Sequence, residues 1–323
     1  MARLPWLAAA AVLLVGVGIA AVATGPLLFT PREVLRALFV EDQGLAHQVI
    51  WNLRLPRVLL AALVGANLAV AGCLLQAVSR NPLADPYLFG ISGGGVLAAV
   101  ASITLVPALD PGYRPAIAFG GALAAGAVTY VLAWRGGVAP VRLVLAGVAL
   151  TSLLTAFTSA LLVTSTASAQ VAVSWLIGGF LGRGWNDLQW LWPYAAAGLL
   201  AALLLAREAN ILVLGDDVAT SLGQRVEPVR AALIAVAALL AGSAVSVSGL
   251  IGFFGLVVPH IARLLAGPDY RVQVPLAGLL GASLLVAGDT AARTVLDPRE
   301  LPVGVLTAAL GVPFLLYLVR RRT

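Results

Sequence analysis

Lysine is absent from this chain of 323 residues, and all 20 of its basic residues are arginine. A nucleotide-binding P-loop uses a lysine to reach the β- and γ-phosphates of ATP. The chain therefore carries no such motif, and we expect that it does not hydrolyse ATP by itself.

Charged residues are also scarce. They make up 11% of the chain, against 61% hydrophobic residues and a mean hydropathy of +1.00. A soluble domain carries roughly 25% charged residues. So much apolar surface cannot be hidden from water in one core, so the composition predicts an all-α protein that crosses a membrane several times.

Metal-binding side chains are few. Cys73 is the single cysteine, which excludes an intramolecular disulfide, and the chain has two histidines and one methionine. A path for bare transition-metal ions would need such ligands. The sequence therefore favours a large cargo that is already chelated, and we expect no cofactor, no metal site and no nucleic-acid partner.

Ten apolar runs are long enough, or nearly so, to cross a bilayer. We expect them to form a single permease domain over residues 1–323. The first run could be a signal peptide, but it extends to Leu28, which favours a membrane helix. Segment 168–182 is too short and glycine-rich for another crossing and predicts a short helix at the membrane surface. The ten predicted spans are 4–28, 57–78, 90–108, 114–134, 142–164, 188–206, 228–247, 250–266, 272–292 and 302–319.

The distribution of arginine between loops predicts the orientation. With the N-terminus inside, twelve arginines fall on the inner side and eight on the outer side. Ten spans then place both termini in the cytoplasm, in a bacterial or archaeal cytoplasmic (inner) membrane.

The stretch SRNPLADPYLFGISGGG (Ser79–Gly95) interrupts the apolar pattern. Pro82 and Pro86 cannot donate backbone hydrogen bonds and disfavour helix at the preceding residue. The stretch is either a simple turn or part of a pore mouth, since irregular backbone at membrane depth must be buried in protein or reached by water. The glycine triplet that follows predicts a close approach between helices.

The polar segment at Ala209–Arg230 predicts a short helix outside the membrane. Acidic residues favour a helix N-terminus, and glycine favours the end of a helix. Such a helix would be a docking element for another protein, or the segment is an ordinary solvated connector. The helix would comprise Gly215, Asp216, Asp217, Ala219, Ser221, Leu222 and Gly223.

The second half of the chain weakly repeats the first. The second and seventh spans both start near arginine and lead into proline- or glycine-rich breaks. Paired interrupted segments of this kind are typical of inverted repeats in transporters.

Six motifs together resemble one family. They are RLPR (Arg54–Arg57), GANLAVAGCLLQ (Gly65–Gln76), NPLADPYLFGISGG (Asn81–Gly94), RLVLAGVAL (Arg142–Leu150), SGLIGFFGLVVPHIARLL (Ser248–Leu265) and ELPVGVLTAALGVPFLLYL (Glu300–Leu318). The chain resembles permease subunits of the FecCD type, which are the membrane half of type II ABC importers for vitamin B12, haem and ferric siderophores.

The resemblance implies ten transmembrane helices and a dimer of permeases, most simply a homodimer. Two ATP-binding cassette subunits would contact the loop at about 207–228, and a periplasmic or lipid-anchored binding protein would dock outside. It also implies a cytoplasmic gate formed by Asn81, Pro82, Leu83, Pro140 and Val141. Where the vitamin B12 permease has a Ser/Thr-rich turn at the second part of this gate, this chain has VAPV.

Three arginines mark the predicted outer side. In relatives, arginines matching Arg54, Arg57 and Arg293 pair with glutamates of the binding protein, and fixed positive charge would steer an acidic partner. The alternative is that they are arginines at the membrane interface. Asp289 is the one acid well inside a span; a structural pair with Arg293, one helical turn away, is favoured over a functional role.

We expect two spans to line the pore. The span over 142–164 carries five hydroxyl side chains, and the last span carries three small or hydroxyl residues on one side. The predicted lining is Thr151, Ser152, Thr155, Thr158, Ser159, Gly304, Thr307 and Gly311.

The leading interpretation is therefore the permease subunit of an ABC importer for a metal chelate. A ferric siderophore is the favoured cargo, with haem and cobalamin as alternatives. An ion-coupled secondary transporter would need an unpaired acid or a relay in the membrane. An integral-membrane enzyme would need a catalytic cluster within the spans, and the sequence contains none.

Overall fold

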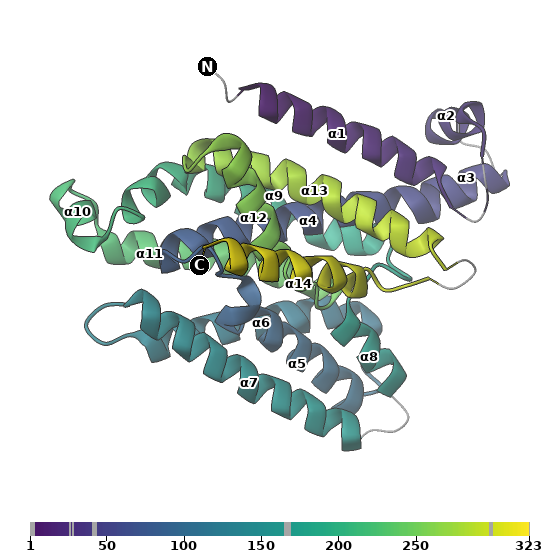
Figure 1. Cartoon of the computed structure of the whole chain (residues 1–323). Coiled ribbons are helices and arrows are strands. Elements are labelled where there is room, and N and C mark those ends of the chain that lie inside the picture. Colours follow the sequence, from purple (N-terminus) through teal and green to yellow (C-terminus); the bar gives the residue numbers. More distant parts are fainter. Residues whose placement is uncertain are drawn as a thin grey trace.

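The computed structural model describes residues 4–25, 27, 29–40, 44–164, 169–296 and 300–322, and the secondary-structure elements that these residues form are all helices. Figure 1 shows most of the long helices running between two ends, with α10 at one end and α2 and α3 at the other. The helices are α1 (Leu4–Ala23), α2 (Pro31–Phe39), α3 (Leu45–Val49), a π-helical turn (Ile50–Arg54), α4 (Leu55–Ser79), a 3₁₀ turn η2 (Pro86–Phe89), α5 (Ile91–Leu105), a 3₁₀ turn (Pro111–Tyr113), α6 (Arg114–Ala133), α7 (Pro140–Thr164), α8 (Ala169–Ile177), α9 (Trp185–Leu212), α10 (Asp216–Ser221), α11 (Val226–Ser248), α12 (Phe254–Ala266), α13 (Tyr270–Thr294) and α14 (Val303–Arg322).

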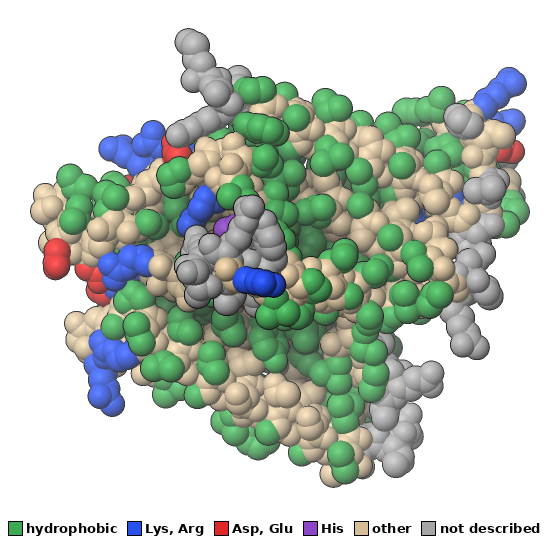
Figure 2. All heavy atoms as spheres, in the orientation of Figure 1, with side chains coloured by type: hydrophobic (Ala, Val, Ile, Leu, Met, Phe, Trp, Pro, Cys, Tyr) green, Lys and Arg blue, Asp and Glu red, His purple; other side chains and the backbone are tan. Residues whose placement is uncertain are grey.

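A helix occupies each of the ten ranges predicted from the sequence. Within the described residues, seven helices are long and apolar enough to cross a membrane, and α5, α12 and part of α14 form shorter apolar helices. The number ten for the membrane crossings therefore stays a prediction. In Figure 2 the acids and most of the visible arginines lie toward the two ends, further arginines lie near the middle beside the histidine, and the rest of the visible surface between the ends is mostly apolar, as expected for a protein surrounded by lipid.

The centre of the molecule is built around α4, which packs against α9, α11, α12 and α13. Small residues allow α4 to approach these helices closely. A Cβ atom added to Gly65 would lie 2.3 Å from the carbonyl oxygen of Gly281 in α13, and one added to Gly72 would lie 1.8 Å from that of Gly255 in α12. Without a hydrophobic driving force between helices in lipid, such close backbone contact is a main source of association.

The glycine triplet after η2 holds α5 against α6. A Cβ atom on Gly94 would lie 2.4 Å from the carbonyl oxygen of Gly121, which confirms the predicted close approach. The hairpin of α5 and α6 then contacts α7, and all three lie below α14 in Figure 1.

The segments that follow the two central helices, α4 and α11, are similar. Each ends in an irregular segment that leads into a short apolar helix, α5 of 15 residues and α12 of 13 residues. The side chains of Asn67 and Ser243 join the two central helices through a hydrogen bond of 3.3 Å. This is the pattern that the predicted internal repeat requires.

Two features at the α2 end differ from the expected spans. The first helix ends at Ala23 rather than near residue 28, before a glycine and a proline that favour termination. The span pattern predicted no helix between the first two spans, where the structure has α2 over Pro31–Phe39, and α3 with the π-helical turn over Leu45–Arg54. The signal for α2 is present in the sequence: Thr30 caps the helix and Glu33 completes a capping box, with proline at the first position.

Candidate functional site

A cavity of about 820 Å³ opens where four separate segments meet. Its walls come from the connection between α4 and α5, the end of α8, the segment before and into α12, and the first turns of α14. The predicted gate residue Leu83 and the predicted pore residue Gly304 both line it. The lining is mostly apolar and includes Leu88, Leu176, Ile177, Leu250, Phe253 and Leu256.

Asp85 fastens the connection between α4 and α5 to the start of α12. Its Oδ1 accepts a hydrogen bond from the backbone N–H of Tyr87 at 2.9 Å, and it also accepts one from the backbone N–H of Gly255. That second N–H belongs to the first turn of α12 and has no partner within its own helix. Burial raises the pKa of Asp85 to about 6, against the effect of the two backbone hydrogen bonds.

A second polar residue, Gln76 of α4, binds the backbone of the same glycine, Gly255. Pro259 has no N–H, so the carbonyl of Gly255 four residues earlier loses its helical partner. The side chain of Gln76 donates to this carbonyl at 3.4 Å. Both backbone groups of Gly255 are therefore satisfied by residues of the first half of the chain.

The predicted gate residues lie in two places. Arg80 adopts a left-handed conformation with φ of 51° and ends α4, and the Asn81 side chain accepts a hydrogen bond from the N–H of Leu83 at 2.9 Å. This turn directs the chain toward the cavity. Pro140 and Val141 form the first turn of α7, where Val141 is exposed, and they are not part of the cavity lining.

The predicted pore residues of α7 mostly satisfy their own hydroxyl groups. Thr151 donates to the carbonyl oxygen of Tyr87 at 2.9 Å and thereby joins α7 to η2. Each of the other four donates to a carbonyl oxygen one turn earlier in α7, as is common for hydroxyl side chains in apolar helices. These four are Ser152, Thr155, Thr158 and Ser159.

The glycines of α14 serve close packing. A Cβ atom on Gly304 would lie 1.8 Å from the carbonyl oxygen of Ile177, and one on Gly311 would lie 2.6 Å from the Cβ atom of Phe253. Thr307 donates to the carbonyl oxygen of Gly304 at 3.0 Å. Substituting either glycine would therefore displace a wall of the cavity.

The predicted short helix after α9 exists as α10. Gly215 precedes it with φ of 110°, Asp216 and Asp217 occupy its first turn, and Gly223 follows it with φ of 83°. Ala219 is buried, whereas the apolar side chains of Leu214, Val218 and Leu222 are exposed beside polar and charged neighbours. Exposed apolar side chains at a charged end are suited to contact with another protein. Ser221 donates to the carbonyl oxygen of Val218.

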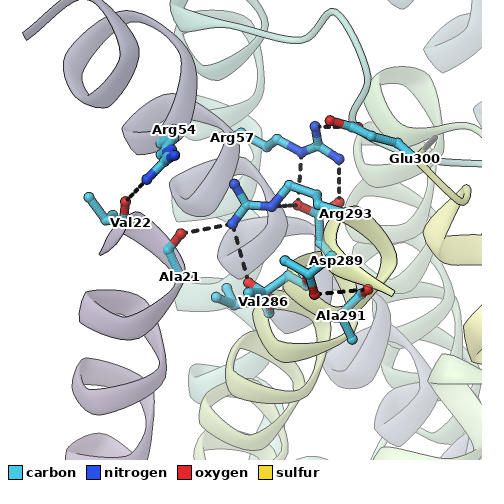
Figure 3. A network of polar contacts seen from close by, with 11 residues as sticks. Ala21, Val22, Arg54, Arg57, Val286, Asp289, Ala291, Arg293 and Glu300 are labelled. Carbon is cyan, nitrogen blue, oxygen red and sulfur yellow. Dashed lines mark hydrogen bonds and ion pairs between the residues drawn. The ribbon is translucent and has the colours of Figure 1, made fainter. Parts of the chain in front are cut away.

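Three arginines and two acids form a cluster near the α2 end (Figure 3). The guanidinium of Arg57 makes two parallel hydrogen bonds with Asp289, at 2.8 and 2.9 Å, and a third with Glu300 at 2.8 Å. Bidentate pairs of this kind are strong and geometrically specific. The two acid partners of Arg57 therefore come from α13 (Asp289) and from the segment before α14 (Glu300), more than 200 residues away in sequence.

The other two arginines satisfy the end of α1. Arg54 donates to the carbonyl oxygens of Val22 and Ala23, at 2.9 and 3.0 Å, and Arg293 donates to that of Ala21 at 2.8 Å. The last carbonyls of a helix have no partner within the helix and attract positive charge. Arg54 and Arg293 are each 5% exposed, so in this conformation their charge is directed inward.

The expected pair of Asp289 with Arg293 is only a secondary contact. The nearest approach between these side chains is 3.8 Å, whereas Asp289 is bound bidentately by Arg57. The helical spacing correctly placed the two residues side by side, but the guanidinium of Arg293 turns toward α1. His260 packs edge-on against Phe314, with ring centroids 5.9 Å apart.

Comparison with known proteins identifies the family. The model of the FecCD transport family matches residues 12–321. The chain belongs to the FecCD transport family. It is 42% identical to the Fe(3+)-citrate import system permease protein YfmD of Bacillus subtilis (strain 168), over 90% of this chain and 86% of that protein.

Two further similarities extend the comparison. The achromobactin transport system permease protein CbrC of Dickeya dadantii (strain 3937) is 42% identical, over 96% of this chain and 89% of that protein. A solved structure, described as an inward-facing conformation of a metal-chelate type ABC transporter, is 28% identical with a TM-score of 0.85 and covers 98% of both chains.

This FecCD protein is therefore a multi-pass membrane permease, and the relatives that it matches are permease proteins of import and transport systems. Membership in this family does not support the alternative of an ion-coupled secondary transporter. Among the residues that the structure describes, no three His, Cys, Asp or Glu side chains are grouped so that they could hold a metal ion.

Sequence reasoning missed two groups of residues near the site. One is Asp85 with Gln76, which bind the backbone of Gly255. The other is the buried Arg230 with Glu227 at the start of α11. The spacing of the second pair, three residues apart on a helix, was a visible signal, but nothing in the sequence indicates which other segments they touch.

Proposed function

We propose that this FecCD permease imports a ferric siderophore, driven by two ATP-binding cassette subunits. Haem and cobalamin remain alternative cargoes. The observation that carries the proposal is the apolar cavity of about 820 Å³ that reaches Leu83 and Gly304. A wall of leucine and phenylalanine side chains suits the organic shell of a chelate better than a hydrated ion. The permeases of ferric citrate and achromobactin import among its relatives support the same class of cargo.

The working unit we propose is a pair of permeases, most simply two copies of this chain. α7 has few buried residues along its 25-residue length, as expected for a helix that faces a second copy across a pore. The pore would be lined by the hydroxyl-bearing face of α7 together with α14, and the gate would comprise Asn81–Leu83 and Pro140–Val141.

The two ends would meet different soluble partners. We place α10 with both termini on the cytoplasmic side, where residues Gly215–Gly223 would contact the ATPase. The binding protein would dock at the other end, over the arginine cluster. There the side chain of Arg57 is 12% exposed and that of Arg293 is 5% exposed. Arg57 would therefore contact the binding protein, while the more buried Arg54 and Arg293 would stabilise the helices around Arg57.

The test is transport in proteoliposomes that contain the permease and its ATPase, with the binding protein added outside. Ferric citrate, a ferric hydroxamate, haem and cobalamin are supplied in turn, and accumulation inside is measured with and without ATP. We expect ATP-dependent accumulation of a ferric chelate. Uptake that follows an ion gradient and ignores ATP would contradict the proposal. Uptake of only haem or cobalamin would correct the cargo and leave the mechanism standing.

A further inference from the structure

Arg230 is a cation buried at the α10 end of the molecule. It is 1% exposed, and the blue and red side chains around this end are visible on the left of Figure 2. A buried guanidinium must be paired to be tolerated. Arg230 is paired twice: its Nη2 donates to Oδ1 of Asp216 at 2.7 Å, and its Nη1 donates to Oε1 of Glu227 at 2.5 Å.

The first of these acids connects Arg230 to two predicted functional segments. Asp216 is the first residue of α10, which is the proposed contact with the ATPase. The same Oδ1 atom lies 3.4 Å from Nη2 of Arg80. Arg80 immediately precedes Asn81, where the proposed gate begins.

The second acid reaches the other part of the proposed gate. The carboxylate of Glu227 accepts the backbone N–H of Val138, with both oxygens 3.3 Å from the nitrogen. Val138 lies two residues before Pro140 at the start of α7. The guanidinium of Arg230 is therefore linked through Asp216 to α10 and to Arg80, and through Glu227 to Val138, two residues before α7.

We infer that Arg230 is a positioning residue that couples the displacement of α10 to both gate segments. This inference rests on the proposed function. The guanidinium is a rigid planar fork, unlike the flexible ammonium of lysine, so a shift of Asp216 is passed on to Glu227. Asp216 also has two cations within reach of one oxygen, Arg230 at 2.7 Å and Arg80 at 3.4 Å. An exchange between these two partners gives the two discrete arrangements that a coupling element requires.

The experiment uses the assembled importer in proteoliposomes and compares cargo transported with ATP hydrolysed. Arg230→Lys keeps the charge and removes the fork, and Glu227→Gln keeps an acceptor and removes the charge. Arg135→Met, an exposed arginine at the same end, is the matched control. We expect both variants at the Arg230–Glu227 pair to assemble with the ATPase and to hydrolyse ATP at close to the normal rate. The amount of chelate moved per ATP should fall about tenfold, within the range that coupling residues produce.

The outcomes separate this inference from the proposed function. An unchanged ratio of transport to hydrolysis in both variants, in an importer that transports normally, would overturn the role of Arg230 alone. A parallel loss of assembly, hydrolysis and transport in both variants would also overturn it, because it would show a purely structural role. An unmutated importer that moves no chelate would instead contradict the proposed function.

Discussion

At the residue scale, the most unusual group beside the cavity is the carboxylate of Asp85. It is 7% exposed and accepts two backbone N–H groups from different parts of the chain. Burial penalises the ionised form and outweighs these hydrogen bonds, so the pKa of Asp85 is raised from its ordinary value of 3.8 to about 6. The attachment of this segment to α12 should therefore depend on pH.

The sign of this dependence follows from linkage. Because the pKa is higher in the folded protein, the contribution of Asp85 to stability is fully present below 3.8 and is lost as the pH rises through about 6. Between about pH 5 and about pH 7.5, we expect the Tm in detergent to fall more in the unmutated protein than in Asp85→Asn. The expected difference is about 2–4 °C, which corresponds to a loss of about 1 kcal/mol in the free energy of unfolding. Asparagine keeps an acceptor for Tyr87 but cannot ionise. Identical pH profiles for the two proteins would show that Asp85 does not titrate in this range.

At the element scale, glycines set how closely α4 approaches two of its neighbours. Gly65 and Gly72 lie on the faces that meet α13 and α12, and a Cβ atom at either would overlap a backbone carbonyl. Backbone atoms cannot rotate out of the way as a side chain can, so the helices themselves would have to move.

A pair of alanine substitutions tests this contact. We expect Gly72→Ala to destabilise the protein by about 1–3 kcal/mol, the cost of inserting a methyl group into a packed interface. Gly16→Ala in α1 is the control, because nothing lies within 4 Å of the added Cβ atom and alanine favours a helix more than glycine does. Thermal denaturation in detergent measures both. If Gly72→Ala proves as stable as Gly16→Ala, the close crossing of α4 and α12 is wrong.

At the scale of the whole molecule, transport requires the cavity to open toward opposite sides in turn. The segment from Arg80 to Gly90 holds only one 3₁₀ turn and is anchored at Asp85 to α12 and at Tyr87 to α7. Its position therefore depends on both of these helices. A shift between them would change the exposure of Leu83, which is half-buried on the cavity wall.

A single cysteine can report this change. Cys73 is fully buried in α4, so the unmutated protein should react slowly with a membrane-impermeant thiol reagent. Leu83→Cys in a Cys73→Ser background should react from the α10 side, at rates that differ between nucleotide-free and ATP-trapped importers. A cysteine at Val131, exposed on α6, should show no such difference. Equal rates for Leu83→Cys in every nucleotide state would mean that this segment is a fixed turn.

The sequence alone determined the long apolar helices and the main breaks between them. Apolar runs of bilayer length, prolines after Arg80 and glycines around α10 act locally, so the ten helical ranges, α8 and α10 could be predicted from neighbouring residues. The motifs also sufficed to predict the family. Helix α2 was missed because a capping box is a weaker signal than an apolar run, although Thr30 and Glu33 carried it.

Only the tertiary structure decided which residues meet. Asp289 could be placed beside Arg293 by helical spacing, yet its carboxylate is bound by Arg57 from the other half of the chain. Likewise, Arg230 and Glu227 could be paired by spacing, but their links to Asp216 and Val138 depend on how α11 packs between distant segments. The physical reason is the range of the forces involved. Hydrogen bonding within a helix and burial in lipid are fixed by adjacent residues, whereas an ion pair or a glycine contact is fixed by the crossing of two helices, which depends on the packing of all the others.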